Sequence, residues 1–149
     1  MKFTIPGRPV AAEEERVTAR GGQVYRYPNP LVARYQAQVR ASWRATNRPP
    51  WPADQALSMG ITVYYPIPPS TGARERARMA GGFHLPARRP DADAVAGLIT
   101  GALTGLAFSD PRQLVRLEVV KCFTPGPAQV VVELRPWGEG LPVGGAVRP

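Results

Sequence analysis

The chain has 149 residues, enough for one compact domain and too few for two of ordinary size. Its 19 Lys and Arg residues outnumber 11 Asp and Glu residues, giving a formal charge of +8 that favours a polyanionic partner, although GC-rich coding would raise the Arg count equally well. A single cysteine and a single histidine exclude a disulfide framework, a thiolate zinc cluster and a metal site with several imidazoles, so carboxylates remain for metal or acid–base chemistry.

The first half of the chain predicts a strand, an arm, a helix and a second strand. Residues 1–5 form a β-type run that Pro6 and Gly7 close. Residues 8–30 have no sustained period and carry three consecutive acids, Glu13 to Glu15, which indicates a mobile arm. Apolar residues at helical spacing over 31–45 predict an amphipathic helix with a basic outer face. Strict alternation over 57–67 then predicts a half-buried strand.

The second half predicts two helices and two strands. Residues 70–80 are a candidate short helix, and residues 81–90 are a basic loop. The apolar positions from Val95 to Leu106 follow the helical rule over three turns. Two strand-like runs, 114–123 and 129–134, are joined by a Pro-Gly turn and predict a hairpin. This order of elements indicates an α+β fold, a sheet with helices packed against it.

The sequence offers no candidate for a membrane span or for an N-terminal signal peptide. No apolar run approaches the roughly 20 residues that span a bilayer. The N-terminus lacks the apolar segment of a signal peptide, so we expect a cytoplasmic protein with no membrane partner. Residues 136–149 are rich in Gly and Pro without periodicity, which predicts a disordered tail and leaves residues 1–135 as the single domain.

Three carboxylates are the candidate chemical centre. Asp91 and Asp93 stand where the chain enters the second long helix, and Asp110 follows that helix. If the helix and its turns bring the three together, the cluster needs a cation, and Mg²⁺ suits a phosphate substrate. The structural alternative is a helix cap and an ordinary Asp-Pro turn. Lys121 shares strand parity with the apolar Val115, so it either ends the buried face or points into a polar site.

The sequence resembles the RusA-type Holliday junction resolvases, small endonucleases common in phages and prophages. The resemblance covers most of the chain and rests on the order and spacing of several motifs: Ile5-Pro6-Gly7-Arg8-Pro9-Val10, Tyr65-Pro66-Ile67-Pro68, the basic stretch from Ser70 to Met79, Arg89-Pro90-Asp91-Ala92-Asp93, Gly101-Ala102-Leu103-Thr104-Gly105, Asp110-Pro111-Arg112-Gln113-Leu114-Val115, and Val119-Val120-Lys121.

The resemblance implies a homodimer with a RusA-like mixed sheet that binds four-way DNA junctions and cuts symmetric strands in recombination and repair. It also implies Mg²⁺, or Mn²⁺, held by aspartates, of which the first two fall on Asp91 and Asp93. Three positions depart from the family pattern: Ala94 replaces an Asn, Gly97 replaces a Lys, and Pro111 stands where a second acid usually follows Asp110. The arm also departs, because it carries three Glu residues where a basic run is usual.

The leading hypothesis is therefore a metal-dependent, structure-selective DNA endonuclease. Asp91, Asp93 and Asp110 are the expected Mg²⁺ ligands, the ion would activate a water for in-line attack, and Lys121 is an electrostatic helper. Arginines before the acid pair would position the DNA backbone without reading sequence: Arg74, Arg76, Arg78, Arg88 and Arg89. The alternatives are a catalytically degenerate junction- or duplex-binding protein of the same fold and an unrelated Arg-rich RNA-binding module.

Overall fold

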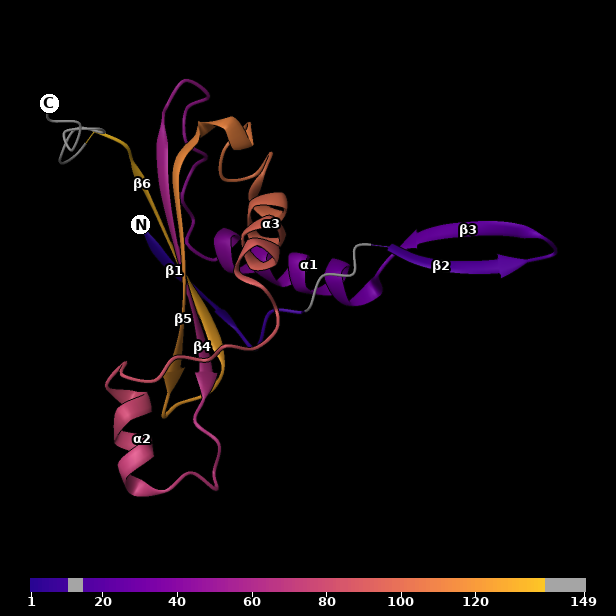
Figure 1. Ribbon diagram of the computed structural model, residues 1–149. Helices are drawn as coiled ribbons and strands as arrows, with labels where there is room; N and C mark the ends of the chain where they lie inside the picture. The colour runs from indigo at the N-terminus through magenta and orange to yellow at the C-terminus, as the bar shows by residue number, and fades with distance from the viewer. Residues whose placement is uncertain (11–14, 139–149) are drawn as a thin grey trace, which may run out of the picture.

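The computed structural model describes residues 1–10 and 15–138, which form a mixed four-stranded sheet with two long helices on one face (Figure 1). This arrangement confirms the predicted α+β class with helices packed on a sheet. The strand order is β1-β6-β4-β5, with bounds Lys2–Pro6, Gln129–Pro136, Leu57–Pro66 and Leu114–Thr124. The helices are α1 (Pro30–Arg44), α2 (Ala73–Ala80) and α3 (Ala92–Leu103), and each agrees with a predicted helix within a few residues.

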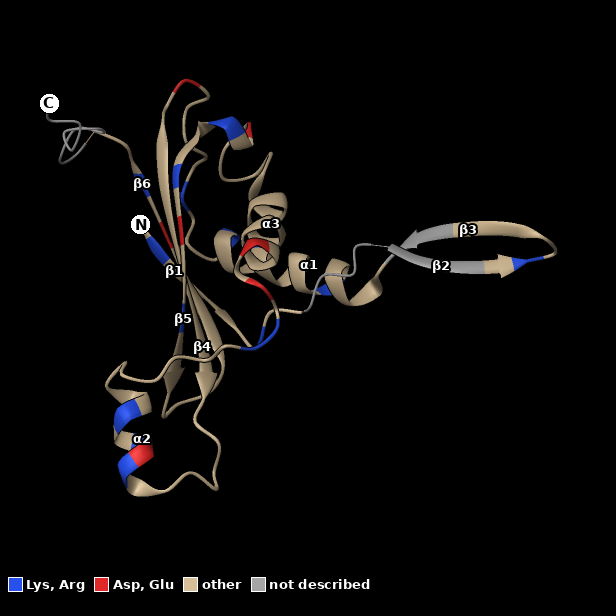
Figure 2. Cartoon of the chain, viewed as in Figure 1, with Lys and Arg blue, Asp and Glu red and all other residues tan. Residues whose placement is uncertain are grey.

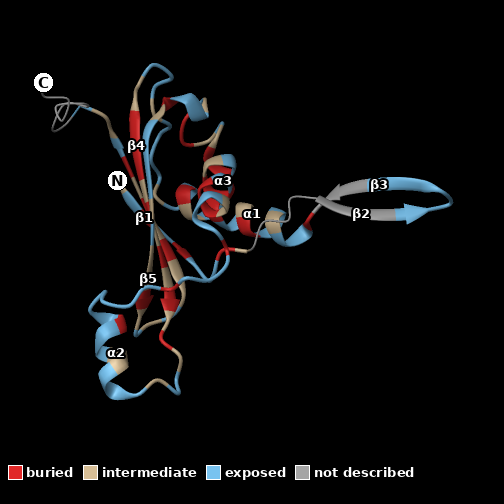
Figure 3. Cartoon of the chain, in the orientation of Figure 1, coloured by how far each residue is buried: buried red, intermediate tan, exposed pale blue. Residues whose placement is uncertain are grey.

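The core lies between the sheet and helices α1 and α3 (Figure 3). Every second residue of β4 is fully buried on this side, from Met59 to Tyr65, as the alternating sequence predicts. Helix α1 contributes Tyr35, Val39 and Trp43 at helical spacing, and α3 contributes an almost continuous apolar face. The opposite side of the sheet carries no helix in the described part of the chain.

A crossover between β4 and β5 determines where the candidate acids lie. These two strands pair in parallel, and the chain between them runs through α2, a loop and α3. Helix α3 therefore runs back along the sheet, with its N-terminus at the carboxyl ends of β4 and β5 and its C-terminus at their amino ends. Carboxyl ends of parallel strands, next to a helix N-terminus, are a common location for ligand sites.

The predicted hairpin between the last two strands is wrong. Strand β4 lies between β5 and β6, so these two strands are not neighbours. The crossover sets β5 parallel to one edge of β4, and β6 enters antiparallel on the other edge of β4, where it also pairs with β1. A short Pro-Gly connection is long enough to pass the end of one strand, so the connecting sequence alone does not separate the two arrangements.

The arm contains regular structure that the sequence interpretation missed. Strands β2 (Glu15–Arg20) and β3 (Gln23–Pro28) pair as an antiparallel hairpin that projects from the body beside α1 (Figure 1). Gly21 and Gly22 form its two-residue turn, with φ of 56° and 77°, the conformation that favours Gly-Gly at such a turn. The acids Glu13 and Glu14 lie outside the described residues.

The last strand of the sheet ends close to the end of the described residues. Strand β6 reaches Pro136, and the backbone N–H of Trp137 donates a 2.8 Å hydrogen bond to the carbonyl of Ala56. The remaining predicted tail, residues 139–149, lies outside the described residues. Among the helices that the structure describes, none is both long and apolar enough to cross a membrane.

Candidate active site and nucleic-acid interface

Asp91 and Asp93 lie at the exposed start of α3. Asp91 is the N-cap residue, yet its side chain makes no capping hydrogen bond, and Asp93 follows in the first turn. Neither carboxylate forms an ion pair or a side-chain hydrogen bond with any described residue. Most N-cap aspartates bind their own helix amides, so a carboxylate left unbound at this position is available to a ligand.

Side chains from β4 and β5 fix the backbone that leads into the acid pair. Lys121 Nζ, on β5, donates hydrogen bonds to the carbonyl oxygens of Arg88 at 2.7 Å and Pro90 at 3.4 Å. The hydroxyl of Tyr65, on β4, donates to the carbonyl of Arg89 at 3.2 Å. Three successive carbonyls before Asp91 are thus held by the sheet. Of the two predicted alternatives for Lys121, the structure shows the polar one.

Arg88 lies over two aromatic rings of the sheet. Its guanidinium carbon is 5.9 Å from the ring centre of Tyr65 and 5.7 Å from that of Phe123, within cation–π range. Burial raises the pKa of Tyr65, and the nearby charge of Arg88 opposes that rise. The Tyr65 hydroxyl therefore stays protonated and remains a hydrogen-bond donor to the loop at neutral pH.

A polar contact joins α2 to the basic loop. The Nδ1 of His84 contacts a carboxylate oxygen of Glu75, and the His84 ring packs edge-on against Phe123 with ring centres 5.6 Å apart. Glu75 also forms an ion pair with Arg78 at 3.2 Å. The hydrogen bond from His84, followed by the charge of Arg78, lowers the pKa of Glu75. Helix α2 is thereby tied to β5 and to the loop that precedes Asp91.

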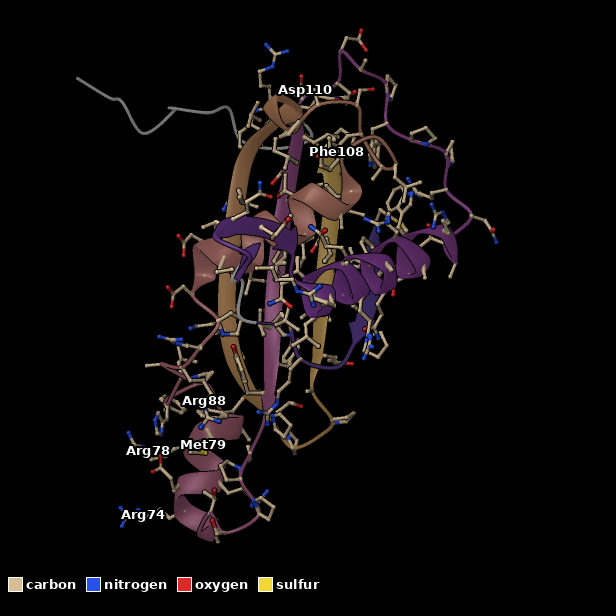
Figure 4. All side chains as sticks on the ribbon, turned by 90° about the vertical axis from the view of Figure 1, so that its right-hand side faces the viewer. Arg74, Arg78, Met79, Arg88, Phe108 and Asp110 are labelled. Atoms are coloured by element: carbon tan, nitrogen blue, oxygen red, sulfur yellow. The ribbon has the colours of Figure 1, made fainter. Side chains whose placement is uncertain are left out.

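The predicted arginines lie on α2 and on the loop that leads into the acid pair, and together they form the basic surface of this end of the molecule (Figures 2 and 4). Arg74, Arg88 and Arg89 are exposed, and Arg78 is exposed apart from its pairing with Glu75. Arg76 is half-buried and donates a 3.3 Å hydrogen bond to the carbonyl of Pro68, so it supports the start of α2 as well.

Two apolar side chains on this surface were missed by sequence reasoning. Phe83 is 80% exposed and Leu85 is 49% exposed, both in the loop after α2. The backbone N–H of Phe83 donates a 2.9 Å hydrogen bond to the carbonyl of Arg78, which fixes the turn that presents the ring. The only available signal was a Phe in an aperiodic stretch among glycines and arginines, where no core periodicity requires an aromatic residue.

Asp110 lies at the other end of α3. This helix has 12 residues, so at 1.5 Å per residue its ends are about 18 Å apart. Figure 4 shows Asp110 and Arg88 at opposite ends of the long strands. Asp110 caps the 3-10 turn Pro111–Gln113, and its carboxylate binds the Arg112 guanidinium at 2.8 to 3.1 Å. These contacts lower the pKa of Asp110.

One chain does not assemble the three expected metal ligands. Across residues 1–10 and 15–138, no three Asp, Glu, His or Cys side chains lie close enough to share an ion. Mg²⁺ prefers octahedral oxygen coordination, and the acid pair offers two carboxylates at most. The expectation that α3 and its turns bring Asp110 to Asp91 and Asp93 is therefore not met within a single chain.

Comparisons with known proteins place the chain in a family. It is 30% identical over 129 residues to the uncharacterized protein YqaN of Bacillus subtilis (strain 168), a match that covers 85% of this chain and 90% of the relative. The family described as endodeoxyribonuclease RusA matches residues 6–135, a range that holds the acid pair, Lys121 and the basic surface. The match confirms the resemblance carried by the sequence motifs, and the chain belongs to the RusA endodeoxyribonuclease family.

Proposed function

We propose that the protein is a divalent-cation-dependent endodeoxyribonuclease that cuts four-way DNA junctions as a homodimer, in recombination and repair. The observation that carries the proposal is the acid pair, Asp91 and Asp93, exposed and unbound at the start of α3. The backbone before the pair is held by Lys121 and Tyr65, and arginines border it. RusA family membership supports nuclease chemistry on DNA in general.

The basic surface supplies the contacts to DNA phosphates. Arg74, Arg88 and Arg89 extend into solvent from α2 and the following loop, so they can reach a phosphate backbone without rearrangement. Such contacts give affinity and position without base specificity, which suits a substrate recognised by its branched shape. Phe83, exposed among these arginines, offers a stacking surface for a base that is unpaired at a branch point.

The acid pair requires a cation to function beside DNA. Two carboxylates repel each other and the scissile phosphate, and a hard divalent cation such as Mg²⁺ or Mn²⁺ removes both repulsions. Asp91 and Asp93 can offer oxygen ligands from one chain. Asp110 can join them only if a second copy presents it, because its own chain holds it at the far end of α3.

A homodimer also fits the substrate. A four-way junction presents two equivalent strands, and a two-fold symmetric protein presents two equivalent acid pairs, so paired symmetric cuts follow from matching the two axes.

Two observations favour a second candidate, a junction-binding protein that does not cut. Helix α3 provides neither a side-chain amide next to Asp93 nor a cationic side chain one turn later, because these positions are Ala94 and Gly97. Arg112 also occupies both carboxylate oxygens of Asp110. A protein with this chain's basic surface and an incomplete catalytic set would bind branched DNA and leave it intact.

The test is an assay on a labelled four-way junction and on a linear duplex of the same arm sequence, with Mg²⁺, with Mn²⁺ and with excess chelator. The nuclease proposal predicts paired nicks in the junction, little cutting of the duplex and no cutting in chelator. Binding without nicks, under conditions where a known resolvase cuts, would establish the second candidate. Tighter binding to single-stranded RNA than to the junction would contradict both.

A further inference from the structure

The arm hairpin, formed by β2 and β3, is a two-stranded ribbon that extends away from the body beside α1 (Figure 1). In the described part of the chain its strands contact chiefly each other, so most of the ribbon is covered neither by the sheet nor by a helix. Near its turn, Tyr25 is 49% exposed. A ribbon of two strands is marginally stable in water unless another surface packs against it. The hairpin therefore has the form of a segment that binds a partner.

The register of the two strands gives the tip of the hairpin two different sides. Residues that face each other in an antiparallel pair point to the same side, and here Arg20 faces Gln23 while Ala19 faces Val24. Tyr25 follows Gln23 by two residues, and its hydroxyl donates a 3.0 Å hydrogen bond to Gln23 Oε1. One side of the tip, which we call the polar side of the hairpin, thus presents Arg20, Gln23 and Tyr25. The other side presents Ala19 and Val24.

The segment that leads to the hairpin leaves the body beside the acid pair. Strand β1 runs parallel to β4, since each is antiparallel to β6, so β1 ends at the end of the sheet where α3 begins. Arg8 follows β1 by two residues and is exposed. Burial raises the pKa of Tyr65, and the charges of Arg88 and Arg8 oppose that rise, which places Arg8 near the ring that binds the carbonyl of Arg89. DNA bound at the acid pair is therefore within reach of the hairpin.

We propose that the arm hairpin lies in the major groove of the duplex next to the branch point, with its polar side against the base edges, and gives the protein a base preference. The major groove is about 12 Å wide and admits a two-stranded ribbon. Strands of six residues extend about 20 Å, which is enough to cross it. The guanidinium of Arg20 then donates two hydrogen bonds to O6 and N7 of a guanine. The amide of Gln23 pairs with N6 and N7 of an adenine, since the Tyr25 hydroxyl takes only one lone pair of Oε1.

The charge of the arm favours base contacts over general attraction to phosphates. Residues 13–28 carry three Glu and three Arg, so this segment has no net charge. Affinity for the DNA backbone grows with the number of cations that neutralise phosphates, and the body supplies such cations as Arg74, Arg88 and Arg89. An Arg and a Gln at the tip of a neutral ribbon instead suit the recognition of base edges. The inference rests on the proposed function for its substrate, branched DNA, and adds to it the source of a sequence preference.

The experiment measures binding of the full chain to a panel of four-way junctions in which the base pairs beside the branch point are changed one at a time. Chelator is present, so that binding is separated from cutting. The wild type is compared with Arg20→Ala and Gln23→Ala. Val24→Ala is the matched control, because Val24 is 64% exposed on the other side of the same ribbon. In a parallel series, 7-deazaguanine replaces the guanine that the wild type prefers, which removes the N7 acceptor from the major groove and leaves the protein unchanged.

We expect the wild type to favour a guanine at one position by about 10-fold, as one bidentate contact provides, and Arg20→Ala to lose this preference. The 7-deazaguanine junction should bind the wild type more weakly and Arg20→Ala no differently, because N7 then has no partner to lose. Gln23→Ala should lose a preference for adenine, and Val24→Ala should keep both preferences.

Three results would overturn the base-reading hairpin and leave the proposed function standing. They are a wild type that binds every junction of the panel equally, an Arg20→Ala variant that keeps the guanine preference, and an equal effect of 7-deazaguanine on the wild type and on Arg20→Ala. Loss of both preferences in Val24→Ala would overturn the assignment to the polar side. A wild type that binds no junction at all would overturn the proposed function together with the inference.

Discussion

Lys121 Nζ donates a 2.7 Å hydrogen bond to the carbonyl oxygen of Arg88, across 33 positions of the chain. This contact joins the edge strand β5 to the loop that leads into α3. It accounts for a lysine on the otherwise apolar face of β5, because the ammonium group of Lys121 holds the loop in place. We call this contact the Lys121 clamp. The position of Asp91, three residues after Arg88, depends on that clamp.

The clamp predicts a positioning effect in Lys121→Met. The variant keeps the aliphatic stem and loses the charged donor, so junction cleavage falls by about 10- to 100-fold as the acid pair loses its fixed position. The protein is destabilised by about 1 kcal/mol. Hydrogen exchange of the backbone amides of residues 84–91 should accelerate, because the loop loses its contacts to Lys121. Removal of a charge elsewhere on the surface should leave this exchange rate unchanged. The control is Lys2→Met, because Lys2 is exposed on β1 and pairs only with Glu133 at 3.9 Å among the described residues. Normal cleavage by Lys121→Met would contradict the clamp.

The basic surface predicts a change in the salt dependence of DNA binding. Arg74→Gln and Arg89→Gln each remove one exposed cation, so the slope of log affinity against log salt should fall in magnitude by about 1 for each phosphate that is no longer bound. The decrease should be the same for junctions of different sequence, because phosphate contacts do not read bases. Fluorescence titrations at several salt concentrations measure the slope. Arg48→Gln is the control, since Arg48 lies over Trp51, whose backbone N–H donates to the carbonyl of Ala107, beyond the C-terminal end of α3 and so away from the acid pair. An unchanged slope in both test variants would remove these arginines from the interface.

Substitution of Gly97 should stabilise the protein. This residue is exposed within α3, and a Cβ built there meets nothing within 4 Å. Gly97→Ala should therefore raise the free energy of unfolding by about 0.5–1 kcal/mol through helix propensity. Gly97→Lys adds a cation one turn after Asp93, on the same helix face, and should also tighten junction binding and raise the cleavage rate. The alanine variant separates the effect of stability from that of charge. Equal activity of the two variants would show that a cation at this position contributes nothing.

We expect the contribution of Asp110 to the stability of the protein to depend on pH. Its hydrogen bonds to Arg112 hold the pKa of Asp110 below the value in the unfolded chain. A lowered folded-state pKa stabilises the protein above the ordinary Asp pKa of about 4, and the contribution is lost as the pH falls through the folded-state pKa. The difference in unfolding free energy between wild type and Asp110→Asn should therefore be largest at neutral pH and shrink below about pH 4. Urea titrations at several pH values measure this difference.

Asp54→Asn, at an exposed loop aspartate without an ion pair among the described residues, serves as the control. A difference that stays constant down to acidic pH would contradict the Arg112 linkage.

The elements of the body were predictable because each has a complete local signature. Alternation over 57–67 matches β4, and helical spacing before and after it matches α1 and α3. Strand neighbours were not predictable in the same way. A run such as 129–134 has the same pattern whether it pairs with β5 or with β4, and only the packing of α3 on the sheet determines which edge remains free. The arm hairpin was missed because its turn signal, Gly21-Gly22, lies between strands too polar to show a clear alternation.

The candidate site was predictable in part for a related reason. Asp91 and Asp93 are two residues apart, so their proximity follows from the sequence alone, and the arginines before them are local as well. Asp110 depends on the length and direction of α3, which carry it away from the pair. The role of Lys121 as a donor to the Arg88 carbonyl depends on the crossover, and no spacing rule reports a contact between residues so far apart.

The most direct test of the acid pair compares cleavage of a four-way junction by the wild type, Asp91→Asn and Asp93→Asn at equal occupancy. The matched control is Glu133→Gln, which removes a carboxylate from the helix-free face of the sheet. We expect both Asn variants to bind the junction at least as tightly as the wild type and to cut it at least about 100-fold more slowly, while the control cuts normally. Normal cutting by both Asn variants, with binding intact, would contradict the central claim that these carboxylates carry the chemistry.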